Sequence, residues 1–183
     1  MTSDLCEKLQ QCFKGRVCLM GLGNIDYGDD GFGVRLAEGL VEAGMPYTIV
    51  AGTMPDRFIG RLADQGFDYL VFLDAVEFSG PPGSAVFLDA GEIMARFPQI
   101  SSHKISLGLL AKWVEEIGIA KACMLGVKPG SLKFEGGLTP VVQTTLEILK
   151  DLLCDLWRGS KESCGASLEE RQSACKPIAE MNV

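Results

Sequence analysis

Short apolar runs that alternate with helix-like segments are the feature that most constrains how this chain folds. Such alternation is typical of βαβ units with a mainly parallel sheet. The run over 69–76 is apolar on both faces, as a central parallel strand would be. We therefore expect an α/β three-layer sandwich, with helices on both faces of a mostly parallel, twisted sheet of about five strands. The expected strands are residues 17–20, 47–52, 69–76, 84–90 and 121–127.

Apolar residues repeat at helical spacing between these runs, as Leu109, Leu110 and Trp113 illustrate. Pro140 suits the first turn of a last helix. The strand at 84–90 follows its predecessor too closely for a crossover connection, so we expect it at an edge of the sheet. The expected helices are residues 30–43, 57–64, 103–116 and 140–157.

Length, charge and hydropathy limit the class of protein. The 183 residues suffice for one domain, which we expect over 1–158, followed by a polar, partly disordered tail over 159–183. The formal charge of −7 argues against a nucleic-acid-binding surface. No apolar run approaches the roughly 20 residues of a membrane helix, and the N-terminus lacks the apolar core of a signal peptide. We expect a cytoplasmic protein that binds neither nucleic acid nor membrane.

The seven cysteines form no C-x-x-C pair and show no zinc-site spacing. Cys18 and Cys123 lie in apolar runs, where a thiol usually acts as a small hydrophobe. We expect all seven to be reduced, as is usual in the cytosol.

The segment GLGNIDYGDDGFG, residues 21–33, directly follows the first expected strand. Ligands of open parallel sheets bind beyond the carboxyl ends of the strands. Three residues are expected on that edge: Asp30 after the glycine-rich loop, Asp74 at the end of the third apolar run, and His103, the single histidine of the chain.

Each of these residues also has a purely structural interpretation. Asp29 or Asp30 could cap a helix. Asp74 could bond a neighbouring loop, although a carboxylate within an apolar strand costs several kcal/mol unless it is paired or coordinated. A lone histidine is more often structural than catalytic. At a helix N-terminus, however, the dipole disfavours the imidazolium form and leaves a neutral ring that can bind metal.

Two carboxylates and one imidazole that converge on one edge would make a three-ligand metal site with open positions. Imidazole with oxygen ligands suits Zn, Fe or Ni better than Mg. A dinucleotide site is disfavoured because Asp26 occupies the third glycine position of G-x-G-x-x-G and would repel a pyrophosphate. A serine hydrolase is disfavoured because no G-x-S-x-G segment exists.

Four motifs, in order and over most of residues 16–153, carry a resemblance to a known family. GLGNIDYGDDGFGVRLAEGL resembles the N-terminal signature of the nickel–iron hydrogenase maturation endopeptidases, which reads G-x-G-N, a short spacer and D-(D/E)-G. YLVFLDAVEFSGPPGS resembles their second acidic motif, and SSHKISLGLLAKW resembles their histidine motif. GVKPGSLKFEGGLTPVV resembles their C-terminal loop-and-helix motif.

The resemblance implies that Asp30, Asp74 and His103 are both the catalytic and the metal-contacting residues, and that Asp29 supports the loop. It implies a peptidase that removes a C-terminal extension from the precursor of a nickel–iron hydrogenase large subunit after nickel insertion. The nickel would arrive with the substrate, and no organic cofactor and a monomeric state are expected. Some members carry Asp-Gly-Gly-Thr after the second strand, where this chain has Val50-Ala51-Gly52-Thr53.

Two other functions stay open at this stage. The same three residues would serve a non-catalytic, nickel-sensing chaperone of the hydrogenase precursor. GLGN also resembles the opening of bacterial peptidyl-tRNA hydrolases, but those enzymes carry a histidine near the following helix, where this chain has DDGFG, and they need a basic surface.

Overall fold

The computed structural model describes residues 2–96 and 106–163. Within these residues, five strands form one sheet in the order β2-β1-β3-β5-β4, in which β4 is antiparallel to β5 and the other pairs are parallel. The α/β class, the mostly parallel sheet and the edge position of 84–90 are confirmed. The strands are β1 Val17–Leu22, β2 Thr48–Gly52, β3 Tyr69–Ala75, β4 Ala85–Asp89 and β5 Lys121–Val127.

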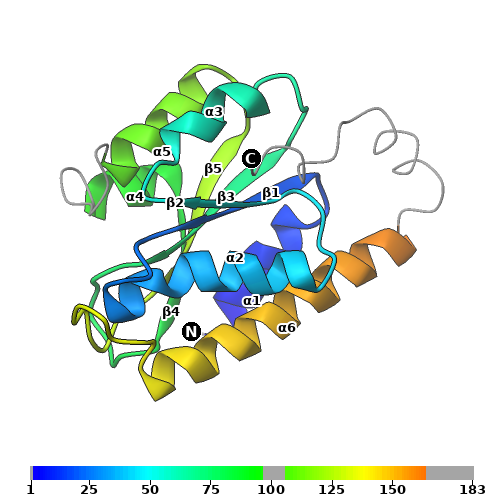
Figure 1. Cartoon of the computed structure of the whole chain (residues 1–183). Helices are drawn as coiled ribbons and strands as arrows, with labels where there is room; N and C mark the ends of the chain where they lie inside the picture. The colour runs from blue at the N-terminus through cyan, green and yellow to red at the C-terminus, as the bar shows by residue number, and fades with distance from the viewer. Residues whose placement is uncertain (1, 97–105, 164–183) are drawn as a thin grey trace.

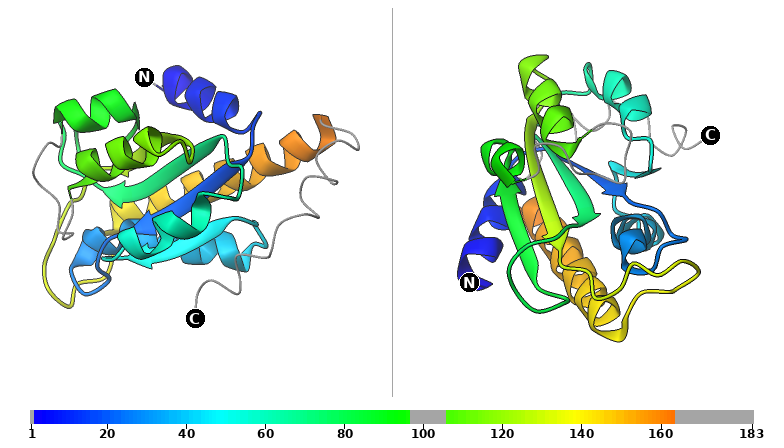
Figure 2. Two further views of the ribbon diagram at one scale, coloured as in Figure 1. Left: turned by 90° about the horizontal axis from the view of Figure 1, so that it is seen from above. Right: turned by 90° about the vertical axis from the view of Figure 1, so that its left-hand side faces the viewer.

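Helices cover both faces of the sheet, so the expected three layers are present (Figure 1). Helices α3, α4 and α5 lie on one face, and α1, α2 and α6 lie on the other, as the turned views also show (Figure 2). The helices are α1 Thr2–Cys12, the 3₁₀ turn η1 Gly28–Gly31, α2 Phe32–Glu42, α3 Asp56–Leu62, α4 Ala90–Arg96, α5 Leu107–Glu116 and α6 Pro140–Ser163.

Strand β3 shows why the sheet needs both helical layers. Leu70 and Phe72 are buried in the core beneath α3 and α5, whereas Val71 and Leu73 are buried in the core beneath α2 and α6. Successive side chains of a strand point to opposite faces, so a continuous apolar run requires cover on both.

The sequence-based prediction missed two helices and misplaced two helix ends. Helices α1 and α4 were not predicted; α4 has only seven residues and follows β4 without an intervening loop. The helix expected from residue 103 is α5, which begins at Leu107 after the N-cap Ser106. The last helix continues beyond residue 157 to Ser163, so the first residues of the predicted polar tail are helical. The rest of that tail, 164–183, lies outside the described residues.

The five described cysteines, Cys6, Cys12, Cys18, Cys123 and Cys154, are free thiols. Complete burial raises the pKa of Cys18, which fits its expected role as a small core residue. None of the helices within residues 2–96 and 106–163 has both the length and the apolarity to cross a bilayer.

Candidate active site

The loops that follow β1, β3 and β5 meet at one edge of the sheet, because these three strands are parallel and adjacent. We call this edge the carboxyl edge. It comprises the loop over 23–31 after β1, the loop over 76–84 after β3 and the loop over 128–139 after β5. The first and the last of these loops lie side by side (Figures 1 and 2).

Asp74 lies near the end of β3, next to Gly126 of β5 in the register of the sheet. Asp74 is only 4% exposed to solvent. Its Oδ1 accepts a hydrogen bond of 2.9 Å from the backbone N–H of Ala75. A carboxylate at this depth costs free energy that hydrogen bonds and a nearby cation can offset.

Gly23 lies close to both the backbone of Asp30 and the carboxylate of Asp74. Its φ angle of +114° lies in a region that side chains disfavour. A Cβ atom on Gly23 would overlap the carbonyl oxygen of Asp30 and would lie 3.8 Å from Asp74 Oδ1. Only glycine therefore lets the backbone of Asp30 approach this closely beside the Asp74 carboxylate.

Asp30 lies in η1, directly before α2, and is partly exposed. Its Oδ2 accepts a hydrogen bond of 2.8 Å from the backbone N–H of Asn24, and its own N–H donates to the carbonyl of Tyr27. These bonds fold the loop back on itself. Asp30 therefore lies at the carboxyl edge, where the sequence predicted it.

Asp29 has a different role from its neighbour, because it is completely buried. Its carboxylate accepts hydrogen bonds from the backbone N–H groups of Gly130, Ser131 and Thr139, and from the Thr139 hydroxyl, at 2.6–2.9 Å. Asp29 thus ties the loop over 23–31 to the loop over 128–139. The expectation that it supports the loop is confirmed.

Two further glycines of the segment serve close packing. A Cβ atom on Gly33 would overlap the carbonyl oxygen of Leu73, and one on Gly21 would overlap that of Gly33. Helix α2 can therefore lie directly against β1 and β3, which brings Asp30 to the edge beside Asp74.

His103 lies outside the described residues. Helix α5 begins at Leu107, and its N-cap is Ser106, whose hydroxyl accepts a hydrogen bond from the N–H of Leu109. The cap expected at Ser101 and Ser102 also lies outside the described residues. Over 2–96 and 106–163, His, Cys, Asp and Glu side chains form no group of three that could hold a metal. The structure thus places Asp30 and Asp74 at the same edge of the sheet. The catalytic and metal-contacting roles of Asp30, Asp74 and His103 all stay predictions.

Comparisons with known proteins decide the family. The sequence model of the hydrogenase maturation proteases matches residues 34–155. The chain is also 31% identical over 140 residues to the hydrogenase 2 maturation protease of Escherichia coli K12, covering 72% of this chain and 84% of that protein. This chain belongs to the hydrogenase maturation protease family. It is accordingly a peptidase, a hydrolase of peptide bonds.

Solved structures agree with this membership of the protease family. A nickel–iron hydrogenase maturation protease from Thermococcus kodakarensis matches with a TM-score of 0.73 at 27% identity, covering 82% of this chain and 99% of that one. The hydrogenase maturating endopeptidase HybD from E. coli matches with a TM-score of 0.66 at 29% identity, covering 79% and 93%. The α/β sandwich of this protease is therefore the fold of that family.

Three residues of the protease site were not singled out from the sequence. Gly23, Asn24 and Thr139 help to hold the loop over 23–31 in place through backbone contacts and hydrogen bonds. Gly23 and Asn24 lie in the first of the four motifs, and Thr139 lies in the last. The motifs therefore marked the right segments, but the partner of Asp29 lies 110 residues away along the chain and no local pattern identifies it.

Proposed function

We propose that this protease removes a C-terminal extension from the precursor of a nickel–iron hydrogenase large subunit after nickel insertion, and that it recognises the inserted nickel. The observation that carries the proposal is the buried carboxylate of Asp74 beside the backbone of Gly23 and Asp30, at the carboxyl edge of the sheet. Two acids gathered at one edge favour a cation between the enzyme and its substrate.

In this proposal nickel belongs to the substrate. Asp30, Asp74 and His103 complete the coordination of the nickel that the precursor carries. Nickel then acts as a Lewis acid that polarises the scissile carbonyl or activates a water. In a variant of this mechanism, one of the two carboxylates accepts the proton of the attacking water. The protease would act in the cytoplasm, as a monomer and without an organic cofactor.

The support comes from the family and from the local geometry. A relative is named for the maturation of hydrogenase 2, which makes a hydrogenase precursor the natural substrate class. Asp30 and Asp74 lie at this edge on two neighbouring strands and their loops, Asp30 partly exposed and Asp74 buried. The partial exposure of Asp30 lets a protein-borne metal approach it.

The mass of the precursor after incubation tests the reaction. We expect nickel-loaded precursor to lose a C-terminal peptide when it is mixed with this protein. An intact precursor held in a stable complex would instead indicate the nickel-sensing chaperone and would refute proteolysis. Salt-sensitive binding of RNA, together with an intact precursor, would favour the peptidyl-tRNA hydrolase alternative.

A further inference from the structure

Exposed apolar side chains gather on the two loops that Asp29 ties together. Phe134 is 62% exposed and Tyr27 is 45% exposed, although both are large aromatic residues. Ile25 and Leu132, in the same two loops, are also exposed. We call the side chains of Ile25, Tyr27, Leu132 and Phe134 the paired-loop surface.

The paired-loop surface is held in place by backbone contacts as well as by Asp29. The N–H of Glu135 donates to the carbonyl of Asp26 at 2.7 Å, and Tyr27 pairs with Gly136 in a short parallel bridge. The rings of Tyr27 and Phe134 lie 5.4 Å apart in a tilted arrangement. Two aromatic rings are thus fixed before any partner binds, which reduces the entropy lost on association.

This surface is continuous with the candidate active site. The carbonyl of Tyr27 accepts from the N–H of Asp30, and Asn24, just before Ile25, donates to the Asp30 carboxylate. A polypeptide whose scissile bond lies beside Asp30 would therefore lie next to the paired-loop surface. Fixed, exposed aromatic residues are typical anchors for a protein partner.

We propose that the paired-loop surface binds an apolar stretch of the substrate polypeptide that flanks the scissile bond. The identity of that substrate as a hydrogenase precursor rests on the proposed function. The occupant is a polypeptide because this enzyme is a peptidase, and it is apolar because the two rings and two aliphatic side chains would otherwise stay in contact with water.

The variant Phe134→Ser tests this surface, with Ile148→Ser as the matched control. Ile148 is 61% exposed and lies on α6, outside both loops. We expect Phe134→Ser to raise KM for the nickel-loaded precursor about tenfold or more, as the loss of one buried aromatic contact would. We expect kcat to stay within about twofold, and both constants of Ile148→Ser to stay unchanged. An unchanged KM, or a fall in kcat alone, would overturn the proposal.

Direct binding separates this inference from the proposed function. If the wild-type protein binds the precursor without cleaving it, a weaker Kd for Phe134→Ser still supports the surface while proteolysis is refuted. If cleavage occurs and Phe134→Ser leaves KM and Kd unchanged, the surface is refuted while the proteolysis stands. A photo-crosslinking residue at position 134 should attach to the precursor within the stretch that flanks the cut. Attachment to a remote part of the precursor would overturn the inference.

Discussion

The two ends of the parallel strands β1 and β3 surround their charged side chains with different groups. At the carboxyl end, Asp30 and Asp74 lie at an edge formed by loops, and the chain's own backbone N–H groups donate to both carboxylates. At the amino end, the Arg16 guanidinium lies 5.1 Å from the ring centre of Tyr47 and 5.2 Å from that of Phe67. The Nη1 group of Arg16 donates to the carbonyl of Gln65 at 2.8 Å.

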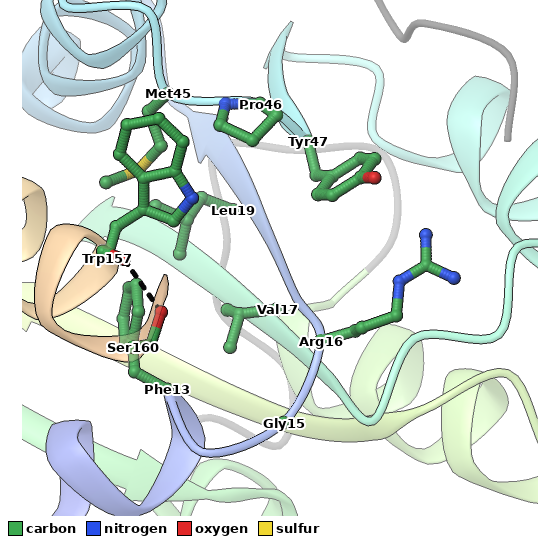
Figure 3. A pocket seen from close by; sticks show the side chains of 10 residues that line it. All are labelled: Phe13, Gly15, Arg16, Val17, Leu19, Met45, Pro46, Tyr47, Trp157 and Ser160. Carbon is green, nitrogen blue, oxygen red and sulfur yellow. Dashed lines mark hydrogen bonds between the residues drawn. The ribbon is translucent and has the colours of Figure 1, made fainter. Parts of the chain in front are cut away.

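The amino end also contains a small cavity, which Figure 3 shows with the ten residues that line it. Its volume is about 40 Å³, enough for a water molecule and far too small for a polypeptide. Trp157 and Ser160 of α6 contribute to its wall. In our proposal the functional end of this sheet is therefore the carboxyl edge, with its acids beside the exposed paired-loop surface, and not the end with the small cavity.

Asp29→Ala should have the largest effect, because it separates the two loops of the carboxyl edge. It would leave three backbone N–H groups without their acceptor, so we expect the free energy of unfolding to fall by about 3–5 kcal/mol. Cleavage should fall as well, since Asp30 would lose its position. Urea denaturation measures the stability. Asp26→Ala, an exposed acid of the same loop, is the control, and equal stability of both variants would refute the role of Asp29.

Asp30→Asn tests the chemistry of the edge with little change in shape. The amide oxygen can still accept from the Asn24 N–H, so the melting temperature should stay close to that of the wild type. Loss of the negative charge should lower the cleavage rate about a hundredfold. Asp26→Asn removes the same charge from an exposed site of this loop and should cleave normally. Equal rates for both variants would remove Asp30 from the mechanism.

Gly33→Ala should move α2 away from the sheet, because the added Cβ overlaps the Leu73 carbonyl. We expect a loss of about 1–3 kcal/mol in the free energy of unfolding. Gly60→Ala in α3 meets no atom within 4 Å and should instead stabilise by up to about 1 kcal/mol. Thermal unfolding distinguishes the two, and a neutral Gly33→Ala would contradict the close packing of α2.

Arg16→Lys should have the smallest effect, and this effect should be limited to the free energy of unfolding. A lysine cannot place a planar guanidinium against Tyr47 and Phe67, so a loss of about 1 kcal/mol is expected. Arg57→Lys, at an exposed position of α3, should change stability by less than about 0.5 kcal/mol. Cleavage should be unchanged in both. A slower cleavage by Arg16→Lys would show that the amino end takes part in function.

Much of the fold was predictable because its strands are buried on both faces. The run over 69–76 reads as a central strand, and it is β3 at the centre of the sheet. The edge position of β4 followed from the short connection before it. Helix α1 was missed although Leu5, Leu9 and Cys12 recur at helical spacing, so the signal for it was present in the sequence.

The positions of Asp30 and Asp74 at one edge of the sheet were predictable, whereas the contacts that hold the loops there were not. Asp30 was selected because it follows the first strand through the glycine-rich loop, and Asp74 because it ends the third apolar run. The structure places both at one edge. The attachment of Asp29 to Gly130, Ser131 and Thr139 depends on which distant loops meet, and only the folded chain determines that. The exposure of Tyr27 and Phe134 likewise depends on tertiary packing that a sequence pattern does not contain.

Cleavage of nickel-loaded and nickel-free precursor, by the wild-type protein and by Asp74→Asn, tests the central claim most directly. The account predicts that the wild-type protein shortens only the nickel-loaded precursor, and that Asp74→Asn shortens neither at a comparable rate while keeping its fold. Equal shortening of both precursors by the wild-type protein, or undiminished cleavage by Asp74→Asn, would contradict it.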